Sequence, residues 1–133
     1  MGEKEINADM GSIESLLKDS VKKRLISDAP VGAYLSGGID SSLITALSRP
    51  YIEEYHTFSI GFDEGVYSEL PFAKVVSDHL DTIHHEVSVT CDKVIKEIEN
   101  IAWHYDDPIA EGGTIPNYFI SKAAKKDITV ALV

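Results

Sequence analysis

The amino-acid sequence predicts an α/β fold in which a parallel sheet carries helices on both faces. The first observation is an alternation along the chain: short apolar runs that suit strands are followed by longer segments with apolar residues every three to four positions. The second is the run 128–133, ITVALV, which is apolar throughout, like a central strand of a parallel sheet. Elements in this order are joined by right-handed crossovers, so we expect all strands to be parallel.

The length and composition fit one domain. A chain of 133 residues that is 44% hydrophobic and 26% charged can bury its own core. We assign residues 12–133 to this domain. The polar, unpatterned residues 1–11 are predicted to form a disordered lead-in.

The first predicted elements are a helix over 12–25, a strand over 31–35 and a helix over 39–47. Ser12 is the expected N-cap of the first helix, whose apolar stripe is Ile13, Leu16, Leu17, Val21 and Leu25. The second helix is expected to bury one side, formed by Ile39, Leu43, Ile44 and Leu47.

The middle of the chain predicts two more strands, 56–62 and 83–89, because their residues alternate between two faces. Between them, Ser68 is expected to cap a helix that ends near Leu80. Pro71 suits its first turn, where a missing N–H is tolerated. The buried stripe of this helix is predicted to be Phe72, Val75, Val76 and Leu80.

The last third predicts a helix that Thr90 opens and that runs to Tyr105, then a loop over 105–116. Thr114 is expected to cap a helix that runs through Lys126, and the strand 128–133 follows. The stripe of the first of these helices is Val94, Ile95, Ile98, Ile101, Ala102 and Tyr105. The loop holds Asp106, Asp107 and Glu111. Long loops of compact domains often contact substrate or metal, but acidic residues before a helix are also ordinary partners of its dipole. Both interpretations stay open.

The charge balance limits the partners. Twelve Lys and Arg against 22 Asp and Glu give a net charge of −10, which disfavours a nucleic-acid surface. Cys91 is the single cysteine and cannot form an internal disulfide. With no signal peptide and no apolar run near 18 residues, we expect a cytoplasmic protein without a membrane partner. The sequence leaves open whether the chain forms a homo-oligomer.

The segment Val31 to Leu47, VGAYLSGGIDSSLITAL, carries the clearest functional pattern. A strand ends in a glycine-rich turn, and a helix begins directly after it. The first turn of a helix has unpaired N–H groups and the positive end of the dipole, so it can bind an anion. The candidate binding residues are Ser36, Gly37, Gly38, Ser41 and Ser42: the glycines allow a close approach of the backbone, and the serines add hydroxyl donors.

Asp40, in the same segment, offers an oxygen ligand of the kind that Mg²⁺ prefers. The expected ligand is therefore a phosphate group with its metal. The loop is not a Walker A loop, because no lysine occurs between Lys23 and Lys74. The alternative is an ordinary strand-to-helix turn with serine and aspartate as caps.

The histidines do not predict a zinc site. His84 and His85 are neighbours on one strand and point to opposite faces, so they cannot readily share an ion. His56, His79 and His104 are scattered among different predicted elements. We therefore expect structural roles for all five histidines.

The pattern S-G-G-x-D-S at 36–41 resembles the pyrophosphate-binding loop (PP-loop) of the ATP pyrophosphatases, which split ATP between the α and β phosphates. Together with SVKKRLISDAPVGAYLSGGIDSS, HTFSIGFDE, HLDTIHHEV, DDPIAEGGTIPNYFISKAAKK and ITVALV, it resembles the synthetase domain of glutamine-hydrolysing asparagine synthetases. The resemblance runs from about Ser12 to Val133. It implies the adenine nucleotide alpha hydrolase-like variant of the Rossmann-like fold, here truncated.

The resemblance also implies a reaction. The side-chain carboxylate of aspartate attacks the α phosphate of ATP, pyrophosphate leaves, and ammonia displaces AMP from the aspartyl adenylate. By this resemblance Ser36, Gly37, Gly38, Ser41 and Ser42 hold the pyrophosphate and Asp40 is the catalytic ligand of Mg²⁺. Leu35 and Ile60 match positions whose backbone holds the adenine.

Two departures from the family pattern stand out. The family places a glutaminase domain with an N-terminal cysteine nucleophile before this domain, whereas this sequence begins with Met1-Gly2. The surroundings of Cys91 do not match those of that nucleophile. The family's second loop, S-G-x-G-x-D-E in pattern, would follow Val133 beside the site, because ligands bind at the carboxyl ends of strands in such sheets. We therefore expect a fragment that has little or no synthetase activity by itself.

Two alternatives remain beside this interpretation. One is another PP-loop amidotransferase or ligase, such as a β-lactam synthetase-like enzyme. The other is a nucleotide-binding module without chemistry, against which the presence of Asp40 argues.

Overall fold

The computed structural model describes residues 10–63, 68–106 and 111–133. The helices are α1 (Met10–Arg24), α2 (Ile39–Ser48), α3 (Leu70–Leu80), α4 (Cys91–Tyr105) and α5 (Thr114–Ala124), with a short 3-10 helix η1 (Arg49–Tyr51). The strands are β1 (Val31–Tyr34), β2 (His56–Phe62), β3 (Ile83–Val89) and β4 (Val130–Leu132). None of the described helices is long and apolar enough to cross a membrane.

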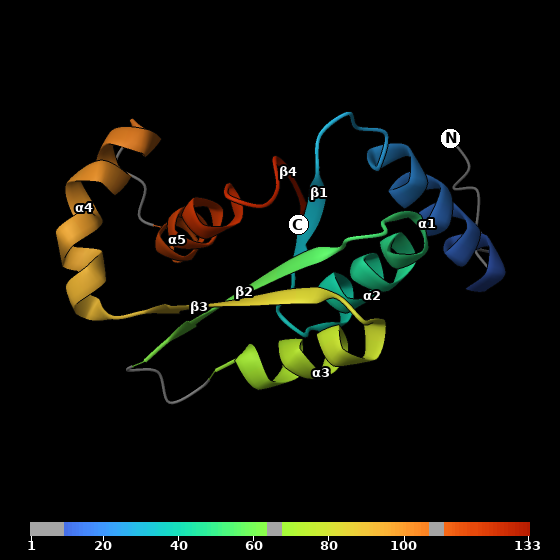
Figure 1. Ribbon diagram of the computed structural model, residues 1–133, viewed down its shortest axis with the longest axis horizontal. Coiled ribbons are helices and arrows are strands. Elements are labelled where there is room, and N and C mark those ends of the chain that lie inside the picture. Colours follow the sequence, from blue (N-terminus) through green and yellow to red (C-terminus); the bar gives the residue numbers. More distant parts are fainter. Residues whose placement is uncertain (1–9, 64–67, 107–110) are drawn as a thin grey trace, which may run out of the picture.

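The four strands form one parallel sheet in the order β3-β2-β1-β4 (Figure 1). β1 pairs with β2 in the register Ala33 to Thr57, and with β4 in the register Gly32 to Ala131. The predicted parallel α/β fold is therefore confirmed. Because β1 lies inside the sheet, the loop that follows it opens at the middle of the carboxyl-terminal edge.

Helices cover both faces of the sheet. On one face α5 packs over β2, where Phe58, Ile120, Ala124 and Ile128 form a buried apolar cluster. On the other face lie α2 and α3, with α1 packed against α2 (Figure 1). α4 lies outside α5 and packs mainly on that helix.

The buried interior under α2 and α3 is rich in hydroxyl groups. The Thr57 hydroxyl lies 2.8 Å from that of Thr82 and 2.9 Å from His84 Nδ1, and Ser59 Oγ lies 2.9 Å from His84 Nε2. Burial is the main cause that lowers the pKa of His84 below its usual value. A neutral imidazole with both ring nitrogens hydrogen-bonded therefore joins β2 to β3.

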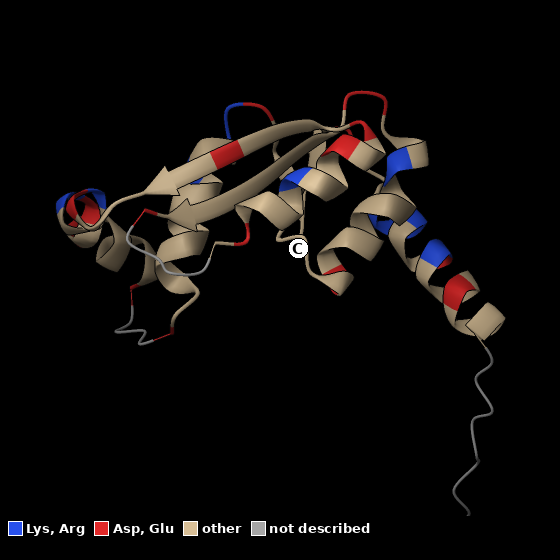
Figure 2. Cartoon of the chain, turned by 90° about the horizontal axis from the view of Figure 1, so that it is seen from below, with Lys and Arg blue, Asp and Glu red and all other residues tan. Residues whose placement is uncertain are grey.

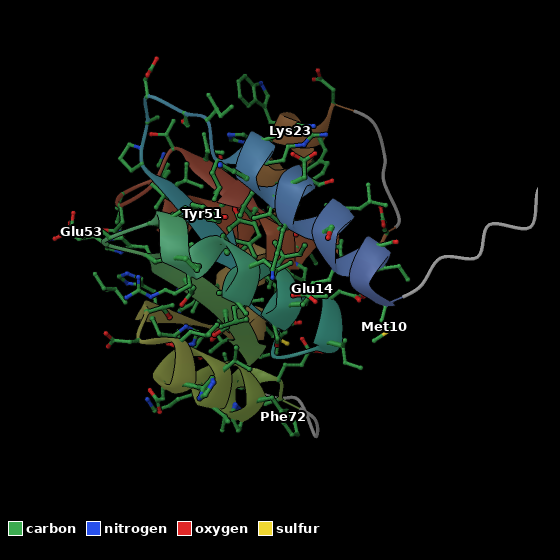
Figure 3. All side chains as sticks on the ribbon, turned by 90° about the vertical axis from the view of Figure 1, so that its right-hand side faces the viewer. Met10, Glu14, Lys23, Tyr51, Glu53 and Phe72 are labelled. Atoms are coloured by element: carbon green, nitrogen blue, oxygen red, sulfur yellow. The ribbon has the colours of Figure 1, made fainter. Side chains whose placement is uncertain are left out.

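Several predicted apolar stripes are wrong in detail. Ile39 is 86% exposed, and Phe72 points outward from the start of α3 (Figure 3). The residues of these helices that are buried are small: Thr45 and Ser48 in α2, and Ala73 and Ser77 in α3. Small side chains let a helix axis come close to its neighbours, and this rotates the larger residues outward.

The outer helices also expose predicted core residues. Leu16 of α1 is exposed while Val21 is buried, and Ile95 and Ile98 of α4 are exposed while Ile101 is buried. α1 packs mainly on α2, and α4 mainly on α5, so one neighbour covers only part of each stripe. Ion pairs Glu14–Lys18 and Asp19–Lys23 span successive turns of α1, as the alternating colours in Figure 2 show.

The predicted helix ends differ in part. Thr90 caps α4 as predicted, accepting a hydrogen bond from the Lys93 N–H at 3.3 Å. Ser68 accepts one from the Leu70 N–H, although Glu69 occupies the capping position of α3. Thr114 does not cap α5, because the helix already includes it and Gly113 precedes it.

The ends of α1, α5 and β4 also fall at other residues. α1 begins at Met10, so Ser12 is not its cap and Met10 and Gly11 belong to the helix; residues 1–9 of the predicted lead-in lie outside the described residues. α5 ends at Ala124, two residues before the predicted end. β4 is limited to Val130–Leu132, because the backbone of Ile128 still bonds to α5.

Candidate functional site

The loop Ser36–Gly38 joins β1 to α2 at the carboxyl-terminal edge of the sheet. Leu35, 1% exposed, continues the pairing: its N–H donates to the Phe58 carbonyl at 2.7 Å. Gly37 then has a φ of 79°, in the left-handed region. A Cβ at this position would lie 2.5 Å from the Ala73 nitrogen, so a larger residue would collide with the backbone of α3. Glycine is therefore required for both the turn and the close contact.

Two serines close the loop on itself. Ser36 Oγ lies 2.9 Å from Ser41 Oγ and accepts a hydrogen bond from the Gly38 N–H at 3.2 Å. The Ser41 hydroxyl also donates to the Gly38 carbonyl at 3.3 Å. These bonds hold the turn in shape, and they bring the first residue of the loop next to the first turn of α2.

The first N–H groups of α2 and the Ser42 hydroxyl remain available to bind a ligand. α2 begins after Gly38, which has no side chain to cap it, and the first N–H groups of a helix have no acceptor within the helix. Ser42 Oγ is buried and has no hydrogen-bond partner among the described residues. A buried hydroxyl without a partner is unfavourable, so this arrangement suits an acceptor such as a phosphate oxygen.

Asp40 lies in the first turn of α2 and is exposed. A carboxylate here is favoured by the helix dipole, but it would repel an anion bound at the same helix end. A divalent cation between the carboxylate and the anion removes this conflict, and carboxylate oxygens are suitable Mg²⁺ ligands. The residues present therefore fit a phosphate with its Mg²⁺.

A cavity of about 270 Å³ lies beside the loop, between the carboxyl ends of β1 and β2 and the start of α5. It is lined by Tyr34, Leu35, Ser36, Ser41, Phe58, Ser59, Ile60, Glu69, Pro116, Asn117, Ile120 and Val133. Four predicted site residues thus meet at one cavity, namely Leu35, Ser36, Ser41 and Ile60. The other four, Gly37, Gly38, Asp40 and Ser42, lie on the loop and the first turn of α2 without lining it.

The cavity also contains polar residues that sequence reasoning missed. Glu69 precedes α3, and Asn117 lies in the first turn of α5. Tyr34, also missed, places its hydroxyl 2.8 Å from Ser121 Oγ. No local pattern marks Glu69 and Asn117, because each comes from a segment far from the loop in sequence.

The acidic loop before α5 is only partly described. Asp107 lies outside the described residues, while Asp106 and Glu111 are exposed. The Tyr105 hydroxyl donates to the Thr114 carbonyl at 3.3 Å and so connects the two described ends. A substrate contact and a solvated connector both stay predictions for this loop.

The histidines are distributed along the chain as predicted, but two of them meet across the sheet. His84 and His85 point to opposite faces, as expected. However, His56 is not isolated: its Nδ1 lies 2.9 Å from His85 Nε2 across the β2–β3 pair. His56, His79 and His104 lie in different elements, as predicted, but the strand register, which sequence spacing does not reveal, brings the His56 and His85 rings together.

The family comparison covers most of the chain. A family model described as asparagine synthase matches residues 12–133. Among curated proteins, asparagine synthetase [glutamine-hydrolyzing] 1 of Bacillus subtilis is 39% identical over 120 residues, which are 90% of this chain and 19% of that protein. The putative asparagine synthetase [glutamine-hydrolyzing] 2 of Methanocaldococcus jannaschii is 42% identical over 121 residues, which are 90% of this chain and 23% of that protein. The chain thus spans about a fifth of the length of these relatives.

Solved structures show the same fold at low sequence identity. The NH3-dependent NAD synthetase from Campylobacter jejuni has a TM-score of 0.59 and 16% identity, covering 93% of this chain and 56% of that one. The NMN synthetase from Francisella tularensis has a TM-score of 0.64 and 14% identity, and the match covers 94% of this chain and 54% of that one. These neighbours confirm the predicted Rossmann-like, PP-loop type of fold.

Proposed function

Because the chain belongs to the asparagine synthase family, we propose that it forms the ATP-binding part of a glutamine-hydrolysing asparagine synthetase, a ligase. In the proposed reaction the side-chain carboxylate of aspartate attacks the α phosphate of ATP and pyrophosphate leaves. Ammonia then attacks the aspartyl adenylate and displaces AMP. The observation that carries this proposal is the loop at the end of β1, where a helix begins and Ser36 and Ser41 line a cavity, together with the buried Ser42 hydroxyl, which has no partner among the described residues.

The loop binds the pyrophosphate in this proposal. Ser36, Gly37, Gly38, Ser41 and Ser42 provide backbone and hydroxyl donors in a turn that is already closed by its own hydrogen bonds. Such fixed donors need little rearrangement when negative charge develops on the leaving group, which is the basis of electrostatic catalysis. Ser42 Oγ gains a hydrogen-bond partner, which it lacks among the residues that the structure describes.

Asp40 is the proposed Mg²⁺ ligand and thus the catalytic residue of this segment. A bound Mg²⁺ neutralises phosphate charge and stabilises the leaving pyrophosphate. With a net charge of −10 and no Lys or Arg among the described residues that line the cavity, this chain offers little other positive charge there. Binding of ATP by this chain should therefore depend strongly on the cation.

The cavity is the proposed adenine site. Leu35 and Ile60 line it at the ends of β1 and β2, so their backbone could meet a flat base as the family resemblance implies. Phe58 and Ile120 make the inner wall apolar, while Asn117 and Glu69 add polar groups at the rim. An apolar pocket with few polar groups is typical of small-ligand sites.

The proposed partners are aspartate, ATP and ammonia, together with a glutaminase domain and the rest of the synthetase domain. The names of the relatives specify glutamine hydrolysis, and the chain covers about a fifth of their length. We propose that the 133 residues alone have little synthetase activity. The cytoplasmic location stays a prediction.

Calorimetric titration with ATP, with and without Mg²⁺, tests the phosphate site. Asp40→Asn should weaken Mg²⁺-dependent binding, whereas Asp92→Asn, at the equivalent place in the first turn of α4, should leave it unchanged. ATP binding that is independent of both Mg²⁺ and Asp40 would contradict the proposed role. A folded chain that binds no ATP would show that these residues do not form a competent site by themselves.

Ser42→Ala separates ligand binding from stability. The buried hydroxyl has no partner among the described residues, so its removal should leave the free energy of unfolding unchanged or slightly raised. Affinity for ATP should fall at the same time, because one donor to the phosphate is lost. A variant that loses stability and keeps its ATP affinity would assign Ser42 a structural role.

A further inference from the structure

Three potential metal ligands meet at the edge of the sheet opposite the phosphate loop. His56 is the first residue of β2, His85 lies in the first half of β3, and Asp127 lies between α5 and β4. One ligand atom from each lies within 4.8 Å of the others. This edge holds the amino ends of the strands, so the cluster is separate from the site at their carboxyl ends.

The strand register brings the two histidines together. His56 pairs with Ile83 and Phe58 pairs with His85, so both histidines project from the same face of the sheet. The His85 ring is stacked on Phe58, with centroids 4.7 Å apart, and on His56, with centroids 5.2 Å apart. Packing therefore holds both rings, and His56 Nδ1 lies 2.9 Å from His85 Nε2.

Asp127 is held in place by its backbone. Its N–H and that of Ile128 both donate to the Ala124 carbonyl, at 3.0 Å and 2.9 Å. Ile128 is buried in the apolar cluster between α5 and the sheet, so the turn cannot easily move away. The side chain of Asp127 itself is exposed, while the two histidines are half-buried. An ion could therefore reach the cluster from solvent.

The spacing suits a small transition-metal ion. At a metal–nitrogen distance of about 2.0–2.1 Å, neighbouring ligands of a tetrahedral ion lie about 3.3 Å apart. The two ring nitrogens, at 2.9 Å, need to separate by only a few tenths of an ångström. In their present hydrogen bond, either His56 Nδ1 or His85 Nε2 carries a proton. If that proton moves to the other nitrogen of the same ring, both facing nitrogens can bind a metal, and the net charge does not change.

We propose that His56, His85 and Asp127 bind one divalent transition-metal ion of the Zn²⁺ class. Two imidazoles and one carboxylate favour Zn²⁺, Co²⁺ or Ni²⁺ over Mg²⁺ and Ca²⁺, which prefer oxygen ligands. The bound ion connects β2, β3 and the turn before β4, and it leaves a fourth position for water. The site is independent of ATP binding: His56 and Ile60 are four residues apart on β2, roughly 13 Å along the strand.

Titration of the whole 133-residue chain with Co²⁺, followed by its visible d–d absorption, tests this site. We expect one equivalent to bind with tetrahedral bands that Zn²⁺ abolishes by competition. Zn²⁺ should also raise the unfolding temperature, whereas Mg²⁺ should not, because an ion that binds only the native state stabilises it.

Single substitutions test which side chains bind the metal ion. Asp127→Asn and His85→Gln should each weaken Co²⁺ binding by at least about tenfold, with native circular dichroism. His79→Gln, on an exposed residue of α3 outside the cluster, should bind as the unaltered chain does. Asp127 is exposed, so its substitution should leave the fold intact even where His85→Gln does not. Absence of the d–d bands at a large excess of Co²⁺, or binding unchanged in Asp127→Asn and His85→Gln, would overturn the proposal and leave a stacked histidine pair.

Discussion

The two faces of the sheet are buried by different chemistry, although adjacent residues of β2 supply both. Phe58 packs against Ile120, Ala124 and Ile128 under α5, and this face is held by apolar contact. Thr57 and Ser59, on either side of Phe58, point to the face covered by α2 and α3, where hydroxyl groups and His84 form a hydrogen-bonded network. Apolar packing tolerates small shifts, whereas a buried hydrogen-bonded network fixes distances and directions. The loop at the end of β1 lies against α3, on the face where positions are fixed by hydrogen bonds.

The largest expected effect is on the apolar face. Phe58 is 1% exposed, so Phe58→Ala should lower the free energy of unfolding by about 3–5 kcal/mol through lost burial and an unfilled cavity. Urea denaturation measures this change. Phe58→Leu, which fills most of the space, should cost markedly less; equal losses in the two variants would show that packing is not what holds this face.

The second-largest effect is expected at Gly37, in the loop between β1 and α2. Gly37→Ala places a Cβ 2.5 Å from the backbone of α3 and forces alanine into a left-handed conformation, which alone costs about 1–3 kcal/mol. We expect lower stability and weaker ATP binding together, because the turn must move away from α3. Gly112→Ala is the matched control, since no atom of the described residues lies within 4 Å of the Cβ that it would add. A Gly37→Ala chain with unchanged stability would contradict the close contact.

The hydroxyl network should respond to the loss of a single oxygen. Thr57→Val keeps the shape of the side chain but leaves Thr82 and His84 each without one partner, which should lower stability by about 1–3 kcal/mol. Thr57→Ser keeps the hydroxyl and removes only a methyl group, so it should cost about 0.5–1.5 kcal/mol. If the serine variant were the less stable of the two, packing rather than hydrogen bonding would dominate this face as well.

The smallest effect concerns the attachment of α4 to the apolar side of the fold. The Glu97 carboxylate accepts hydrogen bonds from Lys122 at 2.8 Å, Tyr118 at 2.7 Å and Asn100 at 3.1 Å. Lys122 is the main cause that lowers the pKa of Glu97 from 4.5 to about 2. Because the folded-state pKa is the lower one, the stabilisation is complete above about pH 4.5 and is lost as the pH falls toward 2.

Denaturation at several pH values measures this contribution. Glu97→Gln should be less stable than the unaltered chain at pH 7, and the difference should shrink as the pH falls below 4.5. Glu99→Gln, which removes an exposed carboxylate from the same helix, is the matched control for the loss of one negative charge. A Glu97→Gln difference that is constant from pH 7 to pH 3 would indicate that the carboxylate charge does not hold α4 to α5.

The sequence by itself determined the features that depend on short stretches of chain. The alternation in 56–62 and 83–89 predicted β2 and β3 to the residue, and S-G-G-x-D-S between an apolar strand and a helix predicted the loop and its position at the end of β1. Strand periodicity, a glycine turn and a helix N-terminus are local properties, so neighbouring residues are enough to specify them.

Only the tertiary structure decided which residues meet. Helix periodicity marked Ile39 and Phe72 as core, but small residues on other sides of α2 and α3 are buried instead, because the close approach of the helices selects them. Glu69, just before α3, and Asn117 of α5 reach the cavity from segments far from the loop in sequence. His56, His85 and Asp127 meet because strand register and the end of α5 place them at one edge. Such contacts depend on how distant elements pack, and no single segment contains that information.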